Sequence, residues 1–211
     1  MASDGDFLTR RQILARGAAS VGISGIAGAF LSSPDIPTPE SGQNNNTEQN
    51  NEVDRDEIPY TIWQYANESD GFRATAPINL VFPLEDATQE TVIDVFRDAG
   101  WVAYPAEYRR YGWDRSAEEY RLQQWTGAES FFGQVGRYHV RCFATDGTLS
   151  IQAHLDTAPQ PTHGIASYSD GKSVVEQLFI SDGWACGEDE LYLGNEQSDH
   201  NGYATVIRRS K

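Results

Sequence analysis

Polar and apolar residues alternate along two neighbouring segments, 138–144 and 148–155, on either side of Asp146-Gly147. A period of two is typical of strands buried on one face, and Asp-Gly is a strong signal for a two-residue type I′ turn. The pattern therefore predicts a β-hairpin with a fixed register. That register gives one apolar face made of the pairs Val140 with Ala153, Cys142 with Ile151, and Ala144 with Leu149.

The opposite face of the predicted hairpin is polar. It pairs Arg137 with Asp156, His139 with His154, and Arg141 with Gln152. Directly opposed residues have β-carbons about 5 Å apart, which is close enough for two imidazoles and a carboxylate to share an ion. This face therefore predicts a site for zinc or another divalent metal.

In this prediction His139, His154 and Asp156 are the metal ligands. His163 follows a proline-containing loop that can fold back over them, and it is predicted to be a fourth ligand or a general base. The alternative is a polar, partly exposed sheet face on which Asp156 pairs with Arg137. A register shift of one residue would disperse the group.

Elsewhere, apolar residues recur with helical spacing in three segments, and short apolar runs indicate further strands. Ser116-Ala117-Glu118-Glu119 matches a capping box and predicts the start of a helix. The first predicted helix begins at 87–90, carries an apolar stripe and ends at Gly100. The second begins at 116 and carries Tyr120, Leu122 and Trp125, and the third spans 172–180. The predicted strands lie at 78–82, 101–104, 191–193 and 203–207. We expect one globular α/β or α+β domain at 59–211, with a mixed sheet of about five to six strands and about three helices.

The chain starts with Thr9-Arg10-Arg11-Gln12-Ile13-Leu14, followed by an uncharged run at 17–31 that is rich in glycine, alanine and serine. Paired arginines before a mildly apolar segment are typical of a twin-arginine signal, which a translocase reads on folded proteins. The alternative is an amphipathic helix with two exposed arginines. We expect residues 1–31 to be a twin-arginine signal or N-terminal anchor, and the protein to be secreted or anchored outside the cytoplasmic membrane.

Residues 32–58 carry many asparagines, prolines and carboxylates. They contain too few aliphatic side chains to offset the entropy of ordering them, so this segment is predicted to be a disordered acidic tether. Asn45-Asn46-Thr47 and Asn67-Glu68-Ser69 match the N-glycosylation pattern, which makes Asn45 and Asn67 candidate modification sites.

Aspartate and glutamate total 31 against 16 lysines and arginines, giving a formal net charge of −15, and the lysines are Lys172 and Lys211. High salt favours an acidic surface nearly free of lysine, because carboxylates bind hydrated cations and the salt screens self-repulsion. The composition resembles that of haloarchaeal proteins; the alternative is an acidic protein of a low-salt environment. Nucleic acid is not an expected partner, since no basic face is visible.

Two cysteines, Cys142 and Cys186, leave open one disulfide or two free thiols. Export permits a bridge, whereas folding in a reducing cytoplasm does not require one. Cys142 is a poor nucleophile because it faces the apolar side of the predicted hairpin. The chain has no G-x-S-x-G elbow, P-loop or H-E-x-x-H motif, which argues against serine hydrolases, nucleotide enzymes and the common metalloproteases.

Aromatic and charged residues are densest between positions 104 and 114. Such a segment can stack on sugars or bind a protein, because rings bury a large area at little entropic cost. The alternative is a connecting loop whose rings cover the edge of the core. The aromatic residues are Tyr104, Tyr108, Tyr111 and Trp113, and the charged ones are Glu107, Arg109, Arg110 and Asp114. His200 is expected to be a turn residue.

Five short motifs follow one another between 77 and 179. They are Ile78-Asn79-Leu80-Val81-Phe82, Asp98-Ala99-Gly100-Trp101, Arg137-Tyr138-His139-Val140-Arg141, Ala153-His154-Leu155-Asp156 and His163-Gly164-Ile165. In this order they resemble the LssY C-terminal domain family. Members of that family are often joined to multispanning membrane segments similar to lipid phosphatases, and no such segment is seen in this chain. The resemblance implies a membrane-surface setting and draws attention to the same histidines and aspartate, without supplying a reaction.

Two functional hypotheses follow. The first is an exported, salt-adapted binding or accessory domain at the cell surface, with a protein, glycan or membrane partner and the twin-arginine translocase as its partner during export. The alternative is a metal-dependent extracytoplasmic hydrolase that uses His139, His154, Asp156 and His163. A purely structural role in the cell envelope is a third hypothesis.

Overall fold

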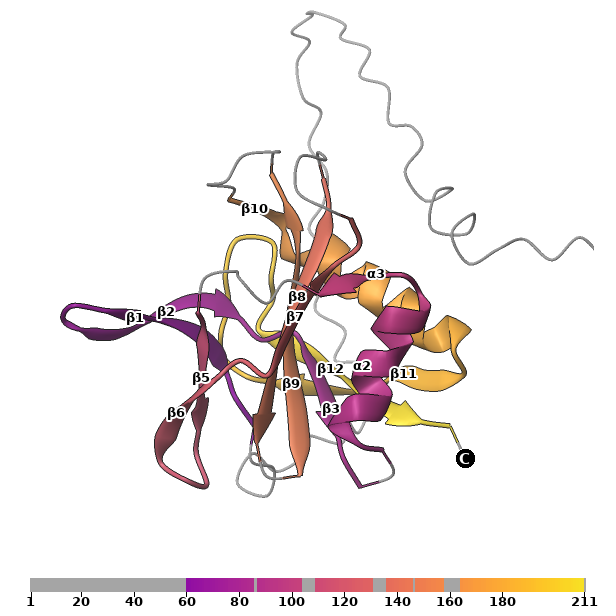
Figure 1. The fold of residues 1–211 in the computed structure, drawn as a ribbon, viewed down its shortest axis with the longest axis horizontal. Helices are drawn as coiled ribbons and strands as arrows, with labels where there is room; N and C mark the ends of the chain where they lie inside the picture. Colours follow the sequence, from indigo (N-terminus) through magenta and orange to yellow (C-terminus); the bar gives the residue numbers. More distant parts are fainter. Residues whose placement is uncertain are drawn as a thin grey trace, which may run out of the picture. The chain divides into compact units, whose positions relative to one another are not determined.

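The computed structural model describes residues 60–85, 87–103, 109–130, 136–145, 147–157 and 164–210. The predicted signal at 1–31 and the predicted tether at 32–58 lie outside these ranges. Within the described ranges, the chain forms two helices and two sheets, a larger one of eight strands and a smaller one of four (Figure 1). The prediction of a mixed α/β fold with a mixed sheet is confirmed, but the structure has more strands and fewer helices than expected.

The larger sheet has the order β11–β12–β3–β9–β8–β7–β4, and β10 pairs with β9. Its neighbouring strands are antiparallel except β12 and β3, which are parallel. The strands are β3 Leu80–Pro83, β4 Val102–Ala103, β7 Trp125–Ala128, β8 Tyr138–Thr145, β9 Thr148–Asp156, β10 Ile165–Ser167, β11 Trp184–Tyr192 and β12 Tyr203–Arg209. The predicted hairpin, β8–β9, thus lies inside the sheet between β3 and β7.

The register of β8 and β9 is the predicted one. Pairing runs without a break from Tyr138 opposite Leu155 to Thr145 opposite Thr148. Gly147 has a φ of +73°, as a type I′ turn requires. A two-residue connection fixes which residues oppose each other, and therefore which side chains share a face.

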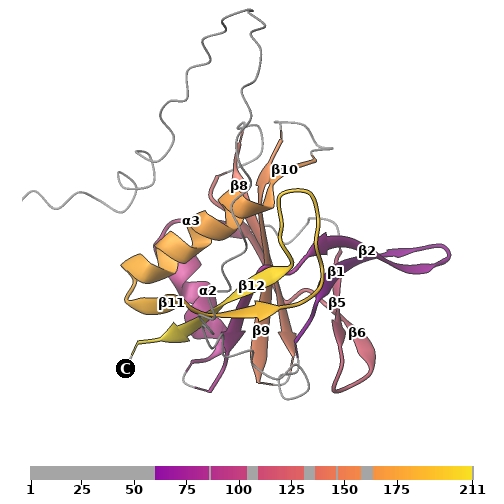
Figure 2. The same cartoon turned by 180° about the vertical axis from the view of Figure 1, so that it is seen from behind.

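Both described helices cover one face of the larger sheet (Figure 2). They are α2 Gln89–Asp98, capped by the Thr88 hydroxyl, and α3 Tyr168–Ser181, capped by the Ser167 hydroxyl. The α3 cap explains why this helix begins before the predicted position 172. Neither helix is long and apolar enough to cross a membrane, and the same holds for all described residues.

Separate apolar clusters form on the two sides of the larger sheet. The cluster under the helices contains the predicted apolar face of the hairpin together with Val92, Ile93, Val95 and Phe96 of α2 and Val175, Leu178 and Phe179 of α3. The other cluster joins Tyr60, Ile78, Val81, Phe143, Leu191, Leu193, Ala204 and Val206. Burial on both sides explains why β8 and β9 have almost no exposed residue.

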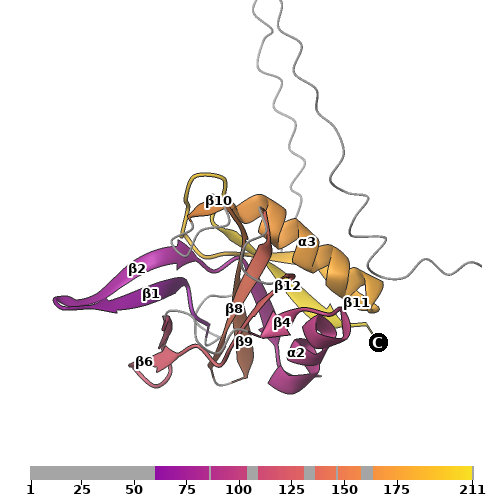
Figure 3. The ribbon, with the colours of Figure 1, turned by 45° about the horizontal axis from the view of Figure 1, so that its top comes forward.

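The smaller sheet was not predicted from the sequence. Its order is β2–β1–β5–β6, with all neighbours antiparallel. The strands are β1 Trp63–Glu68, β2 Gly71–Pro77, β5 Tyr111–Asp114 and β6 Glu119–Leu122. The β1–β2 hairpin projects away from the larger sheet (Figures 1 and 3).

The helix predicted to begin at Ser116 is wrong. Ser116 lies in the turn between β5 and β6, and Trp125 begins β7. Asp114 Oδ1 accepts hydrogen bonds from the Ser116 amide (3.0 Å), the Ser116 hydroxyl (2.7 Å) and the Ala117 amide (3.2 Å). The serine hydroxyl therefore donates to this turn instead of capping a helix, and Trp113 pairs with Tyr120 across the hairpin.

Candidate metal site

The polar face of β8 and β9 brings together the predicted ligands. His139 is paired with His154, and the Asp156 amide donates to the Arg137 carbonyl at 3.0 Å. The side chains are buried rather than partly exposed, with exposed fractions of 0 % for His139 and 2 % for both His154 and Asp156. The alternative of a partly exposed sheet face is therefore wrong, although its pairing of Asp156 with Arg137 is correct.

Close contacts at Ala153 and at His154 itself hold the backbone of β9 at this position. The Asn79 side chain continues the ladder beyond β3, since its Nδ2 donates to the Ala153 carbonyl (2.8 Å) and its Oδ1 accepts from the Ala153 amide (2.9 Å). On the helix side, Gly171 of α3 lies directly against the His154 backbone, where an added β-carbon would be 2.3 Å from His154 Cα. Glycine is required there because any side chain would separate the helix from the strand.

Asp156 is the charged centre of the site. Its Oδ2 accepts from Arg137 Nε at 2.5 Å, and its Oδ1 lies 3.0 Å from His154 Nε2. Burial raises the pKa of this carboxyl, but the hydrogen bonds from His154 and Arg137 outweigh it and lower the pKa to about 2. Asp156 is thus an anion at neutral pH.

The contacts of His154 require a proton or a metal ion between its ring and Asp156. Its Nδ1 lies 2.9 Å from Gln152 Oε1, which is an acceptor, so Nδ1 carries a proton in this amide orientation. Nε2 faces Asp156 Oδ1, another acceptor. Either a proton or a metal ion must therefore lie between Nε2 and Oδ1, because two lone pairs would otherwise face each other at 3.0 Å.

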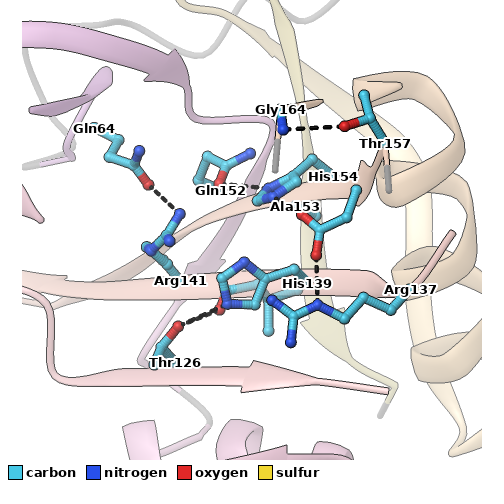
Figure 4. A network of polar contacts seen from close by, with 12 residues as sticks. Gln64, Thr126, Arg137, His139, Arg141, Gln152, Ala153, His154, Thr157 and Gly164 are labelled. Carbon is cyan, nitrogen blue, oxygen red and sulfur yellow. Dashed lines mark hydrogen bonds and ion pairs between the residues drawn. The ribbon is translucent and has the colours of Figure 1, made fainter. Parts of the chain in front are cut away.

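The contact with Thr126 on β7 determines which ring nitrogen of His139 carries the proton. The Thr126 hydroxyl donates to the Val140 carbonyl at 3.1 Å, so it accepts from His139 Nε2 at 3.1 Å. In the neutral ring this leaves Nδ1 as the atom with a lone pair. The two imidazole rings lie edge to face, with centroids 5.0 Å apart (Figure 4).

The three predicted ligands fit a metal ion. One ligand atom each from His139, His154 and Asp156 lies within 4.8 Å of the other two. Both imidazoles donate their other N–H to a neutral oxygen, and Arg137 binds the second oxygen of the carboxylate. Hydrogen bonds of this kind orient the ligands in metal sites.

His163 lies outside the described residues, so its role as a fourth ligand stays a prediction. The neighbouring residues are described: the Thr157 amide donates to the Gly164 carbonyl and the Gly164 amide to the Thr157 hydroxyl, both at 3.0 Å. Ile165 then pairs with Asp156. Thr157 and Gly164, which flank the segment 158–163, are therefore held beside the candidate site.

Two contacts of the site could not be predicted from the hairpin alone. Thr126 comes from β7, and Gln64 comes from β1, where its Oε1 accepts from Arg141 at 3.2 Å (Figure 4). Both are buried polar residues within short strands. A buried polar residue at a core position of a strand is the signal that could have identified them.

The aromatic segment at 104–114 is only partly described. Tyr104, Glu107 and Tyr108 lie outside the described residues. Tyr111, Trp113 and Asp114 belong to β5, and Asp114 is buried at the end of this strand. These rings lie on a sheet and contact aromatic residues from two other strands, since Tyr111 contacts Phe72 and Trp113 contacts Tyr120.

The remaining candidates are separate from this site. Cys142 and Cys186 are free thiols. They lie on β8 and β11, four strand spacings of about 4.8 Å apart, whereas a disulfide needs Cα atoms within about 7 Å. The structure therefore does not form the bridge that the sequence left open. Burial raises the pKa of the Cys142 thiol, as expected for a core residue.

Asn67 is exposed near the tip of the β1–β2 hairpin, where it is accessible to modification, and Asn45 lies outside the described residues. His200 forms a tight turn with Gln197 and is buried, with Nε2 2.9 Å from Asn195 Oδ1. Comparison with protein-family models, with curated proteins and with solved structures gave no match to this chain.

Proposed function

We propose that this protein is an exported, salt-adapted cell-surface domain that binds one divalent metal ion, such as zinc, through His139, His154 and Asp156. The observation that carries the proposal is the convergence of their ligand atoms within 4.8 Å on two paired strands. His139, His154 and Asp156 would each supply one ligand atom to the ion, while Arg137 binds the other oxygen of the Asp156 carboxylate.

Burial supports a binding or accessory role rather than catalysis. A catalytic metal keeps an open position for water or substrate. The three ligand side chains here are at most 2 % exposed. An enclosed ion with hydrogen-bonded ligands stabilises a fold or an interaction surface, because its binding energy is added to the folded state.

A metal-dependent hydrolase is the second candidate. It is supported by the bonds between Thr157, which follows Asp156 in the sequence, and Gly164, which follows His163. In this function His163 is the fourth ligand or the general base. A His163→Ala variant that keeps its zinc but loses hydrolysis would identify the base, whereas lost zinc would identify a ligand.

Export, salt adaptation and the surface location rest on the sequence. The paired arginines at 10–11, the acidic segment 32–58 and the charge of −15 support them. The similarity to the LssY C-terminal domain family is part of the same proposal, with β3, the end of α2, β8 and β9 carrying four of its five motifs. A surface protein, glycan or membrane is the proposed partner.

The metal content of the full-length chain tests the proposed site. We expect about one zinc or manganese ion per chain after purification in high salt without chelator, and a rise in Tm of roughly 5 °C when zinc is returned to chelated protein. His139→Asn with His154→Asn should remove both effects. His200→Asn is the matched control, since it changes a buried histidine outside the site.

A second variant keeps the test informative if the double histidine variant does not fold. Thr126→Val keeps the shape of the side chain but removes the acceptor of His139 Nε2. Loss of such a contact should weaken zinc binding by about 10- to 100-fold. Absence of bound metal together with no shift of Tm in the native chain, or equal affinities for the native chain and Thr126→Val, would contradict the proposed site.

A further inference from the structure

The outer face of the smaller sheet is aromatic. Trp63 and Tyr65 alternate on β1, and the pairing of Tyr65 with Tyr111 places Trp113 on the same face. The other face carries Gln64, which reaches Arg141 of the larger sheet, so the rings lie on the side away from that sheet. Phe72 and Leu122 extend this face and are 37 % and 42 % exposed.

One pocket opens at this face. It has a volume of about 210 Å³, and four of its eight lining residues are aromatic, with Arg115 as its charged residue; the lining residues are Tyr60, Ile62, Trp63, Tyr65, Trp113, Arg115, Leu193 and Gly194. This is smaller than the roughly 300–1,000 Å³ that accommodates drug-sized ligands, so the pocket suits a single ring. None of its lining residues belongs to the candidate metal site.

The lining determines the chemistry of the ligand. Aromatic faces carry negative charge density and attract the polarised C–H groups of a sugar ring. The Arg115 guanidinium is a planar donor that matches a carboxylate. A quaternary ammonium ligand fits poorly despite the aromatic lining, because the same arginine would repel it.

We propose that this pocket binds one hexuronic acid residue of a glycan, with the sugar ring against Trp63 and Trp113 and its carboxylate on Arg115. The site is independent of the proposed metal. In this proposal the glycan partner binds at the aromatic pocket and carries a negative charge.

Binding is measured by isothermal titration of the full-length chain with glucuronate and, separately, with glucose at one salt concentration. We expect glucuronate to bind at least about fivefold more tightly, which corresponds to one partly exposed ion pair. Arg115→Gln should abolish this preference by weakening the binding of glucuronate more than that of glucose. The matched control is Arg209→Gln, which removes an arginine that stacks on Trp184.

A change in the aromatic lining completes the test. Trp113→Phe keeps a ring beside Tyr120 and should weaken both sugars, whereas Trp113→Ala also removes a contact within the sheet. Equal binding of the two sugars, tighter binding of choline than of glucuronate, or no saturable binding would overturn the proposal. Concentration-dependent dimers that Phe72→Ser abolishes, without sugar binding, would instead assign the aromatic face to a second copy of the chain.

Discussion

Neutral oxygens decide which nitrogen of each imidazole is available to a metal. Thr126 takes the proton of His139 Nε2, and Gln152 takes that of His154 Nδ1. Each acceptor therefore leaves the opposite ring nitrogen as the basic one. The buried carboxylate of Asp156 lies beside these atoms. Two imidazoles and a carboxylate whose orientations are fixed by hydrogen bonds form a suitable ligand set for zinc.

At the same residue scale, Gly171 controls how closely α3 approaches this site. Its substitution by alanine would place a β-carbon 2.3 Å from His154 Cα and 2.4 Å from the His154 amide nitrogen. Because both are backbone atoms, the helix or the strand must move. We expect Gly171→Ala to lower the free energy of unfolding by about 2–4 kcal/mol and to weaken zinc binding by displacing His154.

Urea denaturation and zinc titration measure these two effects. Gln177→Ala is the matched control, because Gln177 is exposed on the same helix and its substitution should change stability by less than about 0.5 kcal/mol. A Gly171→Ala protein as stable as this control would show that α3 and β9 are not in such close contact.

At the scale of elements, side-chain oxygens decide between a helix and a turn. Ser116-x-x-Glu119 has the sequence of a capping box, but the preceding Asp114 bonds to the amides of Ser116 and Ala117 and closes a hairpin. Arg121 on β6 also contacts Asp114 at 3.0 Å. These contacts join residues on two strands, and pairing between strands is not visible in a local motif.

The conformation of Glu118 gives a test of this hairpin. Its φ is +53°, a left-handed conformation that glycine adopts without strain. We expect Glu118→Gly to leave the free energy of unfolding unchanged or to raise it by up to about 1 kcal/mol. In a helix the same substitution would cost about 1 kcal/mol.

Thermal and urea denaturation measure whether Glu118→Gly raises or lowers the free energy of unfolding. Ala117→Gly serves as the control, since Ala117 has no positive φ and glycine should destabilise the chain there by roughly 0.5–1 kcal/mol. Equal losses from both substitutions would contradict the hairpin and favour the helix.

Local patterns predicted the parts of the fold in which turn chemistry and periodicity agree. The Asp-Gly turn fixed the register of β8 and β9, and therefore the proximity of His139, His154 and Asp156. The burial of this face was not predictable, because it depends on Gln64 and on strands more than 70 residues away. Likewise β1 was missed, since its pairing with β5 is long-range and gives little local signal.

At the scale of the whole molecule, the excess of negative charge among the described residues lies on the surface. The described core encloses Arg137 and Arg141 together with Asp114 and Asp156, whereas most carboxylates of the described helices and turns are exposed. A net charge of −15 then repels itself across the surface. Screening relieves this repulsion at moderate salt in any acidic protein, whereas hydrated cations bound to carboxylates add stability at higher salt.

These two effects separate above about 1 M salt, where the Debye length is about 3 Å and screening is almost complete. We expect the Tm of the full-length chain to keep rising in potassium chloride between about 1 and 3 M, because cation binding continues after screening ends. Tetramethylammonium chloride is the control, since it supplies the same ionic strength with a weakly hydrated cation and should raise Tm less. A Tm that levels off below about 1 M in both salts would identify an acidic protein of a low-salt environment, and the salt-adapted part of the proposed function would then be wrong.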